Sequence, residues 1–235
     1  MIFNNIGFIF AREGSKGLPN KNILDLCGKP LIQWTIETAL KSRMIDKLIV
    51  STDSTKIANL AKKLGADVPF IRPKELALDS TPEIEAWKHA IDYMYSKGNN
   101  FKRFISLPCT SPLRIVSDID RAVEIYTKNK ADLLISVYES NHNPFFNMIK
   151  ITNDLCSRIF SDDNKIYYNR QSAPKVWNIG TLIYISNPEY IMNNNDIYSG
   201  KVIPFEIPQE RSIDIDSQYD FDIAEFLMKK RKNDF

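Results

Sequence analysis

The chain has 235 residues, a formal net charge of +2 and 43% hydrophobic residues. These values exclude a disordered or collagen-like chain, and the balance of 31 basic against 29 acidic residues gives no electrostatic footprint for duplex nucleic acid. A chain of this length can bury a sizeable core. Its 8 glycines are unevenly placed, because Gly7, Gly14, Gly17 and Gly28 all lie close to the N-terminus.

Strand-like and helix-like segments alternate through the first part of the chain. Short apolar runs that end in loops predict buried strands at residues 6–10, 48–52, 104–107 and 133–137. Amphipathic runs with start and stop signals predict helices at residues 30–42, 56–64, 81–97 and 117–128. Ser117 and Asp120 have the spacing of a capping box, and residues 68–71 are extended. The alternation predicts an α/β fold of three layers, with a mostly parallel twisted sheet between helices.

The rhythm changes after Tyr138. Residues 139–178 are rich in Asn, Pro, Asp and aromatic residues, and they contain period-2 fragments such as 148–152. We interpret this segment as a small β-rich arm inserted into a single domain that spans residues 1–235. Strands are expected again at 181–185 and 202–207, followed by a helix at 219–231.

Several features bear on the compartment. No segment approaches the roughly 20 apolar residues of a membrane span, and the first residues lack the features of a signal peptide. The cysteines at positions 27, 109 and 156 are odd in number and have no metal-ligand spacing. We therefore expect a cytoplasmic protein with reduced thiols and no membrane partner. With 2 histidines, the chain is poorly supplied for a zinc site or a Ser-His-Asp triad.

The loop after the first predicted strand combines glycines with cations. It contains Gly14, Gly17, Arg12, Lys16 and Lys21. Glycines allow backbone N–H groups to turn inward around an anion, and the cations offset the charge of a triphosphate. The loop matches neither the Rossmann nor the Walker A pattern, which disfavours a dinucleotide-dependent oxidoreductase. An ordinary basic surface loop is the alternative interpretation.

Two aspartates near the C-terminus form the second candidate feature. Asp214 and Asp216 are separated by one residue on a predicted short strand, so their carboxylates point to the same side. Such a pair suits a hard cation that bridges phosphate oxygens, which predicts a Mg²⁺ site. An edge strand with polar residues facing outward is the alternative. Asp53 follows the second predicted strand and either faces the site or caps the next helix.

Six segments follow one another across nearly the whole chain. They are Phe10–Asn22, Val50–Asp53, Arg72–Ala77, Thr110–Arg114, Arg170–Gln171 and Ile213–Asp216. In this order and spacing they resemble the signature of the acylneuraminate (CMP-sialic acid synthetase-like) cytidylyltransferases. The resemblance implies a Mg²⁺-dependent enzyme that transfers CMP from CTP to the anomeric hydroxyl of a nine-carbon α-keto sugar acid, releasing pyrophosphate. It also implies a homodimer in which the arm reaches the neighbouring subunit's site.

The resemblance assigns the N-terminal loop to CTP. The implied phosphate contacts are Arg12, Gly14, Ser15, Lys16 and Lys21, with Asn22 near the ribose. Fixed N–H groups and cations at these positions would oppose the charge that develops on leaving pyrophosphate. Lys21, Asp214 and Asp216 are therefore the expected catalytic residues, the two aspartates as metal ligands.

The cytosine base presents an N4 amino donor beside the N3 and O2 acceptors. Its binding site must therefore supply both kinds of hydrogen-bonding group. Arg72, Ser80 and Thr81 lie in the matching segment and are our candidates.

The sugar side departs from the sialic-acid enzymes. Those enzymes typically carry Leu-Gln-Pro-Thr-Ser-Pro-Leu-Arg, with the Gln at the sugar, whereas Pro108 replaces that amide here. Their Asn-Gly is changed to Gly180-Thr181, and aromatic residues occupy arm positions where they often carry Lys. Because an unpaired sugar hydroxyl costs about 1–3 kcal/mol, a more apolar acceptor of legionaminic or pseudaminic type is expected. The expected acceptor contacts are Pro108, Thr110, Phe145, Phe146, Arg170 and Gln171.

Alternatives remain for the arm and for the function. Arg170 would pair with the carboxylate or acyl group of the sugar, whereas Phe145 and Phe146 could instead serve core packing. The segment 214–216 is also an Asp-x-Asp, as in metal-dependent glycosyltransferases, which would be expected to carry it mid-chain. A non-catalytic nucleotide-binding domain would not need both the aspartates and the basic loop.

Overall fold

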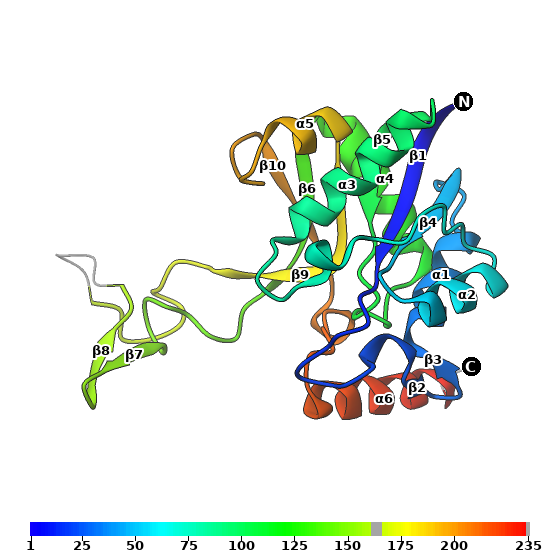
Figure 1. Ribbon diagram of the computed structural model, residues 1–235. Coiled ribbons are helices and arrows are strands. Elements are labelled where there is room, and N and C mark those ends of the chain that lie inside the picture. Colours follow the sequence, from blue (N-terminus) through cyan, green and yellow to red (C-terminus); the bar gives the residue numbers. More distant parts are fainter. Residues whose placement is uncertain (161–165, 234–235) are drawn as a thin grey trace.

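The computed structural model describes residues 1–160 and 166–233. Within these residues, a sheet of six strands forms the centre of the body, in the order β10-β6-β9-β5-β1-β4 (Figure 1). The strands are β1 (Ile2–Phe10), β4 (Lys47–Ser51), β5 (Asn100–Ser106), β6 (Leu133–Glu139), β9 (Trp177–Ser186) and β10 (Val202–Glu206). Strand β9 runs antiparallel to β5 and β6, whereas the other neighbouring pairs are parallel. The prediction of a mostly parallel sheet is confirmed.

Helices cover both faces of this sheet. Helices α1 (Leu31–Lys41), α2 (Thr55–Lys63) and α4 (Val116–Asn129) pack on one face, and α3 (Glu83–Ser96) and α5 (Pro188–Asn193) on the other. Successive side chains of β1 point to opposite faces of the sheet. Ile9 therefore packs in the hydrophobic core on the side of α1, α2 and α4, and Phe8 packs in the core on the side of α3 and α5. The expected three-layer architecture is confirmed.

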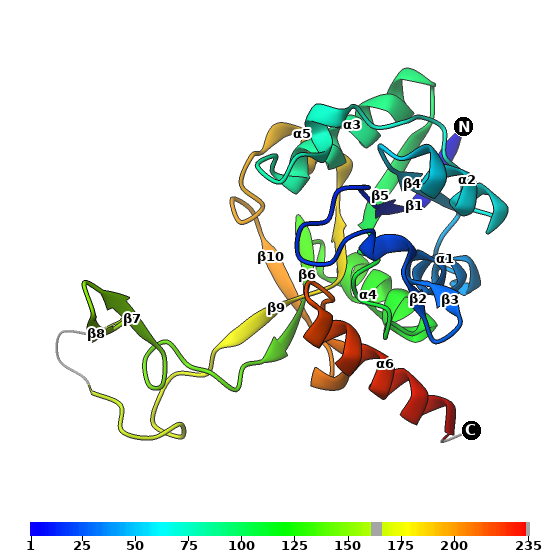
Figure 2. The same ribbon diagram turned by 60° about the horizontal axis from the view of Figure 1, so that its bottom comes forward.

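A third, smaller core joins the two ends of the chain. Helix α6 (Gln218–Asn233) lies beside the hairpin of β2 (Asp25–Leu26) and β3 (Lys29–Pro30), as Figure 2 shows. The hairpin turn requires positive φ at both central residues, Cys27 at 54° and Gly28 at 86°. Because Leu26 and Ile215 are both fully buried in this cluster, the segment before α6 is held next to the N-terminal loop.

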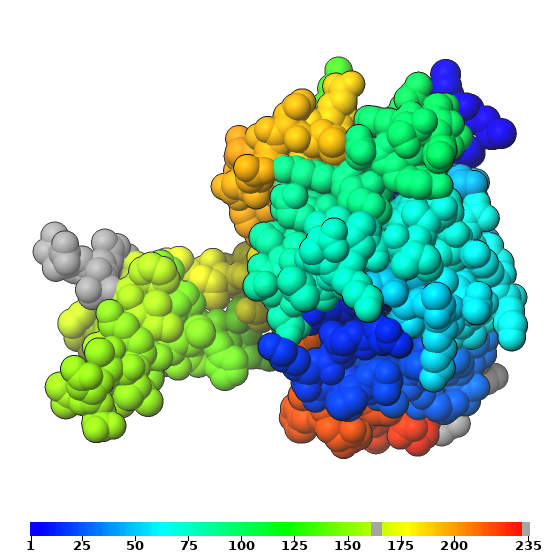
Figure 3. All heavy atoms as spheres, in the orientation of Figure 1, coloured from blue at the N-terminus to red at the C-terminus, as the bar shows by residue number. Residues whose placement is uncertain are grey.

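The arm runs between β6 and β9 and stands away from the body (Figure 3). It carries the hairpin of β7 (Ile149–Thr152) and β8 (Leu155–Arg158), whose turn again has two residues with positive φ. The predicted β-rich arm is therefore present, and residues 161–165 within it lie outside the described residues. The assignment of the whole chain to a single domain stays a prediction.

Two local expectations are wrong. Helix α4 is capped through Asp118, whose Oδ2 accepts the Ile115 N–H at 3.0 Å, and not through the predicted Ser117 and Asp120. Asp120 instead accepts a hydrogen bond from Ser42. Residues 213–216, which were expected to include a short strand, belong to no strand of the structure.

The remaining turns of helix are short. They are η1 (Lys21–Ile23), η2 (Lys74–Ala77) and η3 (Gln209–Arg211). No helix in the described part of the chain is both long and apolar enough to cross a bilayer.

Candidate active site

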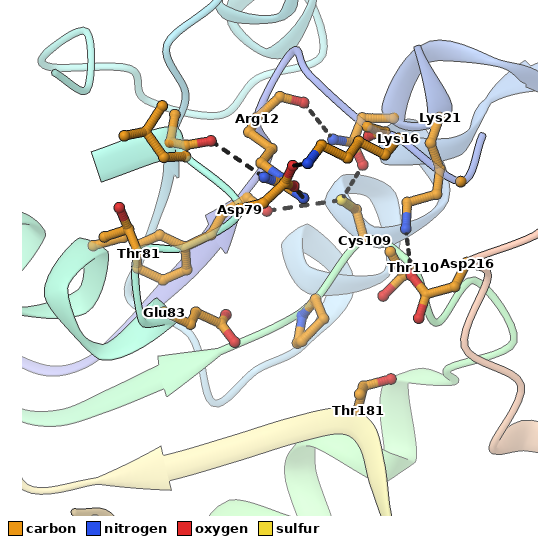
Figure 4. A pocket seen from close by; sticks show the side chains of 18 of the residues that line it. Arg12, Lys16, Lys21, Asp79, Thr81, Glu83, Cys109, Thr110, Thr181 and Asp216 are labelled. Carbon is orange, nitrogen blue, oxygen red and sulfur yellow. Dashed lines mark hydrogen bonds and ion pairs between the residues drawn. The ribbon is translucent and has the colours of Figure 1, made fainter. Parts of the chain in front are cut away.

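A cavity of about 390 Å³ opens at the carboxyl ends of β1 and β5 (Figure 4). Ligands bind at this edge of open α/β sheets because the loops that follow parallel strands converge there. The walls are formed by the N-terminal loop after β1, residues 72–83, residues 108–110 after β5, Thr181 and Tyr184 of β9, and residues 214–216 before α6.

Most of the residues expected from sequence meet in this cavity. They are Arg12, Ser15, Lys16, Lys21, Asn22, Arg72, Thr81, Pro108, Thr110, Asp214 and Asp216. Two expected nucleotide contacts, Gly14 and Ser80, do not line it. The four expected arm residues, Phe145, Phe146, Arg170 and Gln171, lie outside the cavity of their own chain.

The cations of the N-terminal loop already have a carboxylate partner. Arg12 and Lys16 both form ion pairs with Asp79, the Lys16 Nζ at 2.7 Å (Figure 4). Hydrogen bonds from Lys16 and Arg12 lower the pKa of the Asp79 carboxyl. Sequence reasoning missed Asp79, although it lies seven positions beyond Arg72, between two candidate cytosine contacts. Its carboxylate bridges the two cations.

The two glycines of this loop do not adopt the left-handed backbone conformation. Neither Gly14 nor Gly17 has a positive φ, and the left-handed residue of the loop is Asn20, at φ 55°. Gly17 is needed for another reason, because a Cβ there would collide with the Asp216 carbonyl oxygen. No described atom lies within 4 Å of the position that a Cβ on Gly14 would take. The predicted role of these glycines in turning N–H groups toward an anion stays a prediction.

The two aspartates line the cavity on the segment that precedes α6. The Ile215 N–H donates to the Thr110 carbonyl at 2.9 Å, which fixes the segment beside the loop after β5. Because Ile215 is fully buried in the small core, its neighbours Asp214 and Asp216 both face the cavity. Asp216 forms an ion pair with Lys21 at 2.7 Å. The expectation that both carboxylates share one side is met.

Asp214 has an unusual environment. Its Oδ1 is buried and has no hydrogen-bond partner among the described residues. Burial raises the pKa of the Asp214 carboxyl, while the hydroxyl of Thr110 partly offsets the effect. A buried carboxylate oxygen without a donor is a group that a hard cation satisfies.

Asn22 is held from two sides at the floor of the cavity. The Cys109 thiol donates to Asn22 Oδ1 at 2.8 Å, and Asn22 Nδ2 donates to the Arg12 carbonyl at 2.8 Å. Burial raises the pKa of the Cys109 thiol to about 11, so the sulfur keeps its proton and remains a donor at neutral pH. The side-chain amide of Asn22 therefore has one orientation.

Arg72 and Glu83 face the cavity from the segment that leads into α3. Burial lowers the pKa of the Arg72 guanidinium, and Asp53 and Glu83 oppose this effect. Loss of hydration raises the pKa of Glu83, although its side chain remains open to solvent through the cavity. Tyr184, whose pKa burial raises, completes this side. Glu83 and Tyr184 carried no sequence signal that separated them from ordinary surface and core residues.

The remaining candidates lie elsewhere. Asp53 accepts the Glu13 N–H at 2.9 Å, so it holds the N-terminal loop rather than capping α2. Phe145 stacks on Phe160 within the arm, with ring centroids 5.2 Å apart. Arg170 donates to the Asn141 carbonyl at 2.7 Å.

Both the sequence and the fold are similar to those of known proteins. The chain matches a family model described as "Cytidylyltransferase" over residues 6–232. It is 36% identical over 227 residues to the N-acylneuraminate cytidylyltransferase of Escherichia coli O18:K1:H7, covering 96% of this chain and 52% of that protein. The chain thus spans about half the length of that relative.

Another relative is matched almost end to end. The chain is 34% identical over 221 residues to the CMP-N,N'-diacetyllegionaminic acid synthase of Campylobacter jejuni, covering 94% of this chain and 93% of that protein. The fold of this chain is similar to that of CMP:2-keto-3-deoxy-manno-octonic acid synthetase complexed with CTP. This match has a TM-score of 0.70 and 15% identity, and it covers 97% of this chain and 99% of that one. At this identity the likeness concerns the fold alone.

Proposed function

Because this chain belongs to the cytidylyltransferase family, we infer that it transfers CMP from CTP to the anomeric hydroxyl of a sialic-acid-like nonulosonic acid. The observation that carries this function is the Lys21–Asp216 ion pair, which joins the basic loop and the aspartate segment at one cavity. A glycosyltransferase is disfavoured, because the Asp-x-Asp segment follows the last strand of the sheet instead of lying mid-chain. A purely nucleotide-binding domain would not need both features.

The cations of the N-terminal loop would hold the triphosphate. Arg12, Lys16 and Lys21 line one wall of the cavity, and each is paired with an aspartate that phosphate oxygens can replace. Attack of the sugar hydroxyl on the α-phosphorus forms an O–P bond and breaks the bridge to the β-phosphate. Pyrophosphate then leaves, and the loop cations stabilise the charge that develops on it.

Asp214 and Asp216 fit a Mg²⁺ ion. Asp214 has a buried oxygen without a partner, and Asp216 presents an exposed carboxylate beside it. The described residues contain no cluster of three or more His, Cys, Asp or Glu side chains that could hold a metal. Phosphate oxygens and water would therefore complete the coordination, as Mg²⁺ commonly requires. When bound, the ion would polarise the α-phosphate.

We propose an acceptor of legionaminic or pseudaminic type. Pro108 supplies no polar contact where sialic-acid enzymes place an amide, and Thr110, Thr181 and Tyr184 offer few hydrogen-bonding groups. The similarity to a diacetyllegionaminic acid synthase supports this choice. In such sugars, hydrogen or acetamido groups stand where sialic acid has hydroxyl groups. Fewer sugar hydroxyls would therefore be left without a hydrogen-bond partner in this cavity.

We also propose a homodimer joined through the arm. Ile151 and Leu155 are 70% and 73% exposed on the β7–β8 hairpin, which does not pack on its own body. Apolar side chains gathered on a protruding hairpin favour burial against a second copy. The arm would then carry Phe145 and Arg170 toward the partner's cavity. The enzyme would act in the cytoplasm, where CTP is supplied.

A coupled pyrophosphate assay tests the function. The full-length protein is incubated with CTP, Mg²⁺ and a panel of nonulosonic acids that includes sialic, legionaminic and pseudaminic acids, with Kdo as the eight-carbon comparison. We expect acceptor-dependent pyrophosphate release and a CMP-sugar product, fastest with a legionaminic or pseudaminic acid. No product with any acid would contradict the proposed function, and a preference for sialic acid would contradict only the acceptor assignment.

Sedimentation tests the dimer. Ile151→Asp places a charge on the exposed arm and should shift the protein toward monomer. The control, Tyr219→Asp, alters an equally exposed residue on α6 and should leave the oligomeric state unchanged. A wild-type monomer at micromolar concentration would contradict the proposal.

A further inference from the structure

Glu83 lines the cavity, and the proposed chemistry does not use it. It is the first residue of α3 and extends into the cavity (Figure 4). Its Oε1 accepts a hydrogen bond from the Trp87 indole N–H at 3.1 Å. Trp87 is 3% exposed and packed in the core, so it fixes the orientation of the carboxylate. No other hydrogen bond or ion pair of Glu83 is present among the described residues, which leaves Oε2 available to a ligand.

Arg72 supplies donors to the same cavity. Its side chain is buried, with the residue 5% exposed, and its Nε–H has no hydrogen-bond partner in the described part of the structure. Burial raises the pKa of Glu83 and the charge of Arg72 opposes this effect, which places the two groups within electrostatic reach. Arg72 and Glu83 both line the cavity, so a guanidinium and a carboxylate are presented to one space. Together they offer a donor and an acceptor.

The other expected base contacts do not supply the acceptor. Ser80 does not line the cavity. The Thr81 hydroxyl donates its proton to the Glu75 carbonyl at 2.7 Å, so its position is already fixed by the segment that carries it. Among the side chains of this segment, Glu83 is the one that presents a free carboxylate oxygen to the cavity.

We propose that Glu83 determines the specificity for cytosine by accepting a hydrogen bond from its N4 amino group, while Arg72 donates to the N3 and O2 side. This inference rests on the proposed function, because it assumes that CTP binds in this cavity. A carboxylate is the usual acceptor for the cytosine amino group. Uracil instead presents the O4 oxygen at that position. With uracil, the Glu83 carboxylate would face the lone pairs of O4 and would have no hydrogen-bond donor. UTP is therefore rejected.

The substitution Glu83→Gln separates this role from a structural one. The Trp87 N–H is a donor, so it holds the amide oxygen of the new side chain and turns the NH₂ group toward the base. This NH₂ group donates to O4 of uracil and opposes the amino group of cytosine. Calorimetric titration of the full-length protein with CTP and with UTP should show the ratio of the two affinities falling at least tenfold, with UTP binding gained.

The control is Glu85→Gln on the same helix. Glu85 pairs with Lys88 at 3.8 Å and does not line the cavity, so the CTP/UTP ratio should stay at its wild-type value. Glu83→Ala is the second variant. It removes the acceptor without adding a donor, and should weaken CTP binding without improving UTP binding. Circular dichroism and thermal unfolding verify that each variant is folded.

The outcomes distinguish the two levels of the proposal. If the wild-type protein binds neither nucleotide, the proposed function itself fails. If it prefers CTP and Glu83→Gln keeps that preference, or changes only the KM of the sugar acid, the inference about Glu83 is overturned and the proposed function stands.

Discussion

Lys21 and Asp216 are separated by 195 positions in the chain, and their side chains meet at 2.7 Å on the wall of the cavity. The lysine is nearly buried, with its side chain 12% exposed, whereas that of the aspartate is 74% exposed. An ion pair open to solvent contributes little to stability, on the order of 0–1 kcal/mol. Its importance is therefore positional, because it holds two groups assigned to the reaction next to each other before substrate binds.

Asp216→Ala should retain the fold and lose turnover by orders of magnitude. The exposed carboxylate contributes little to packing, but its loss removes one of the two proposed Mg²⁺ ligands. Steady-state pyrophosphate release measures the activity, and thermal unfolding measures the fold. Unchanged turnover would remove the metal assignment from Asp216.

Gly17→Ala should damage the site by a steric route. The added Cβ would collide with the Asp216 carbonyl, so either the N-terminal loop or the aspartate segment must move. We expect a clear loss of turnover and a lower unfolding temperature. For comparison, Gly14→Ala adds the same methyl group in open space and should leave the unfolding temperature within about 1 °C. Equal unfolding temperatures of the two variants would contradict this prediction, because they would mean that the backbone at Asp216 moves away from the added Cβ without loss of stability.

Asp79→Asn should strengthen CTP binding several-fold. Asp79 pairs with Arg12 and Lys16, so the triphosphate must displace its carboxylate before both cations can bind phosphate. The asparagine keeps the shape of the side chain and removes the competing charge. Calorimetric titration with CTP measures the effect. Asp67→Asn, which removes an ion pair with Lys47 outside the cavity, is the matched control.

The effect of Asp79→Asn should depend on pH in a defined direction. The two cations hold the pKa of Asp79 below its usual value, so the wild-type carboxylate stays charged through neutral and mildly acidic pH. The gain in affinity should therefore persist over that whole range, and should disappear only when the pH falls through this lowered pKa. Weaker CTP binding by the variant at neutral pH would mean that Asp79 positions Arg12 for the nucleotide instead of competing with it.

Cys109→Ala should weaken CTP binding through Asn22. The thiol is the donor that satisfies Asn22 Oδ1, and an unpaired buried acceptor costs about 1–3 kcal/mol. Part of that cost would appear as a raised KM for CTP, because the amide loses its fixed orientation. Cys109→Ser keeps a donor at the same position and should recover most of the affinity. Equal KM values for the two variants would contradict a positioning role.

The sequence was informative wherever a structural signal is local. Helices and strands follow from the spacing of apolar residues along the chain, so the layers and the mostly parallel sheet could be predicted. The basic loop and the aspartate pair were identified because each is compact in sequence and chemically distinctive. Strand β9 was not recognised as antiparallel, since its direction depends on where the arm returns to the sheet.

Contacts between distant segments could not be predicted in this way. The function class and the candidate residues of the loop and aspartate segment were determined by the sequence alone, because residue type and order carry that information. Only the tertiary structure decided that Asp79 pairs with the loop cations, that Gly17 allows a close approach to Asp216, and that Glu83 and Arg72 line one cavity. These relationships depend on how the third core packs α6 against the N-terminal hairpin and on how residues 72–83 enter α3. These contacts depend on packing between segments that are far apart in the sequence, so no short sequence pattern predicts them.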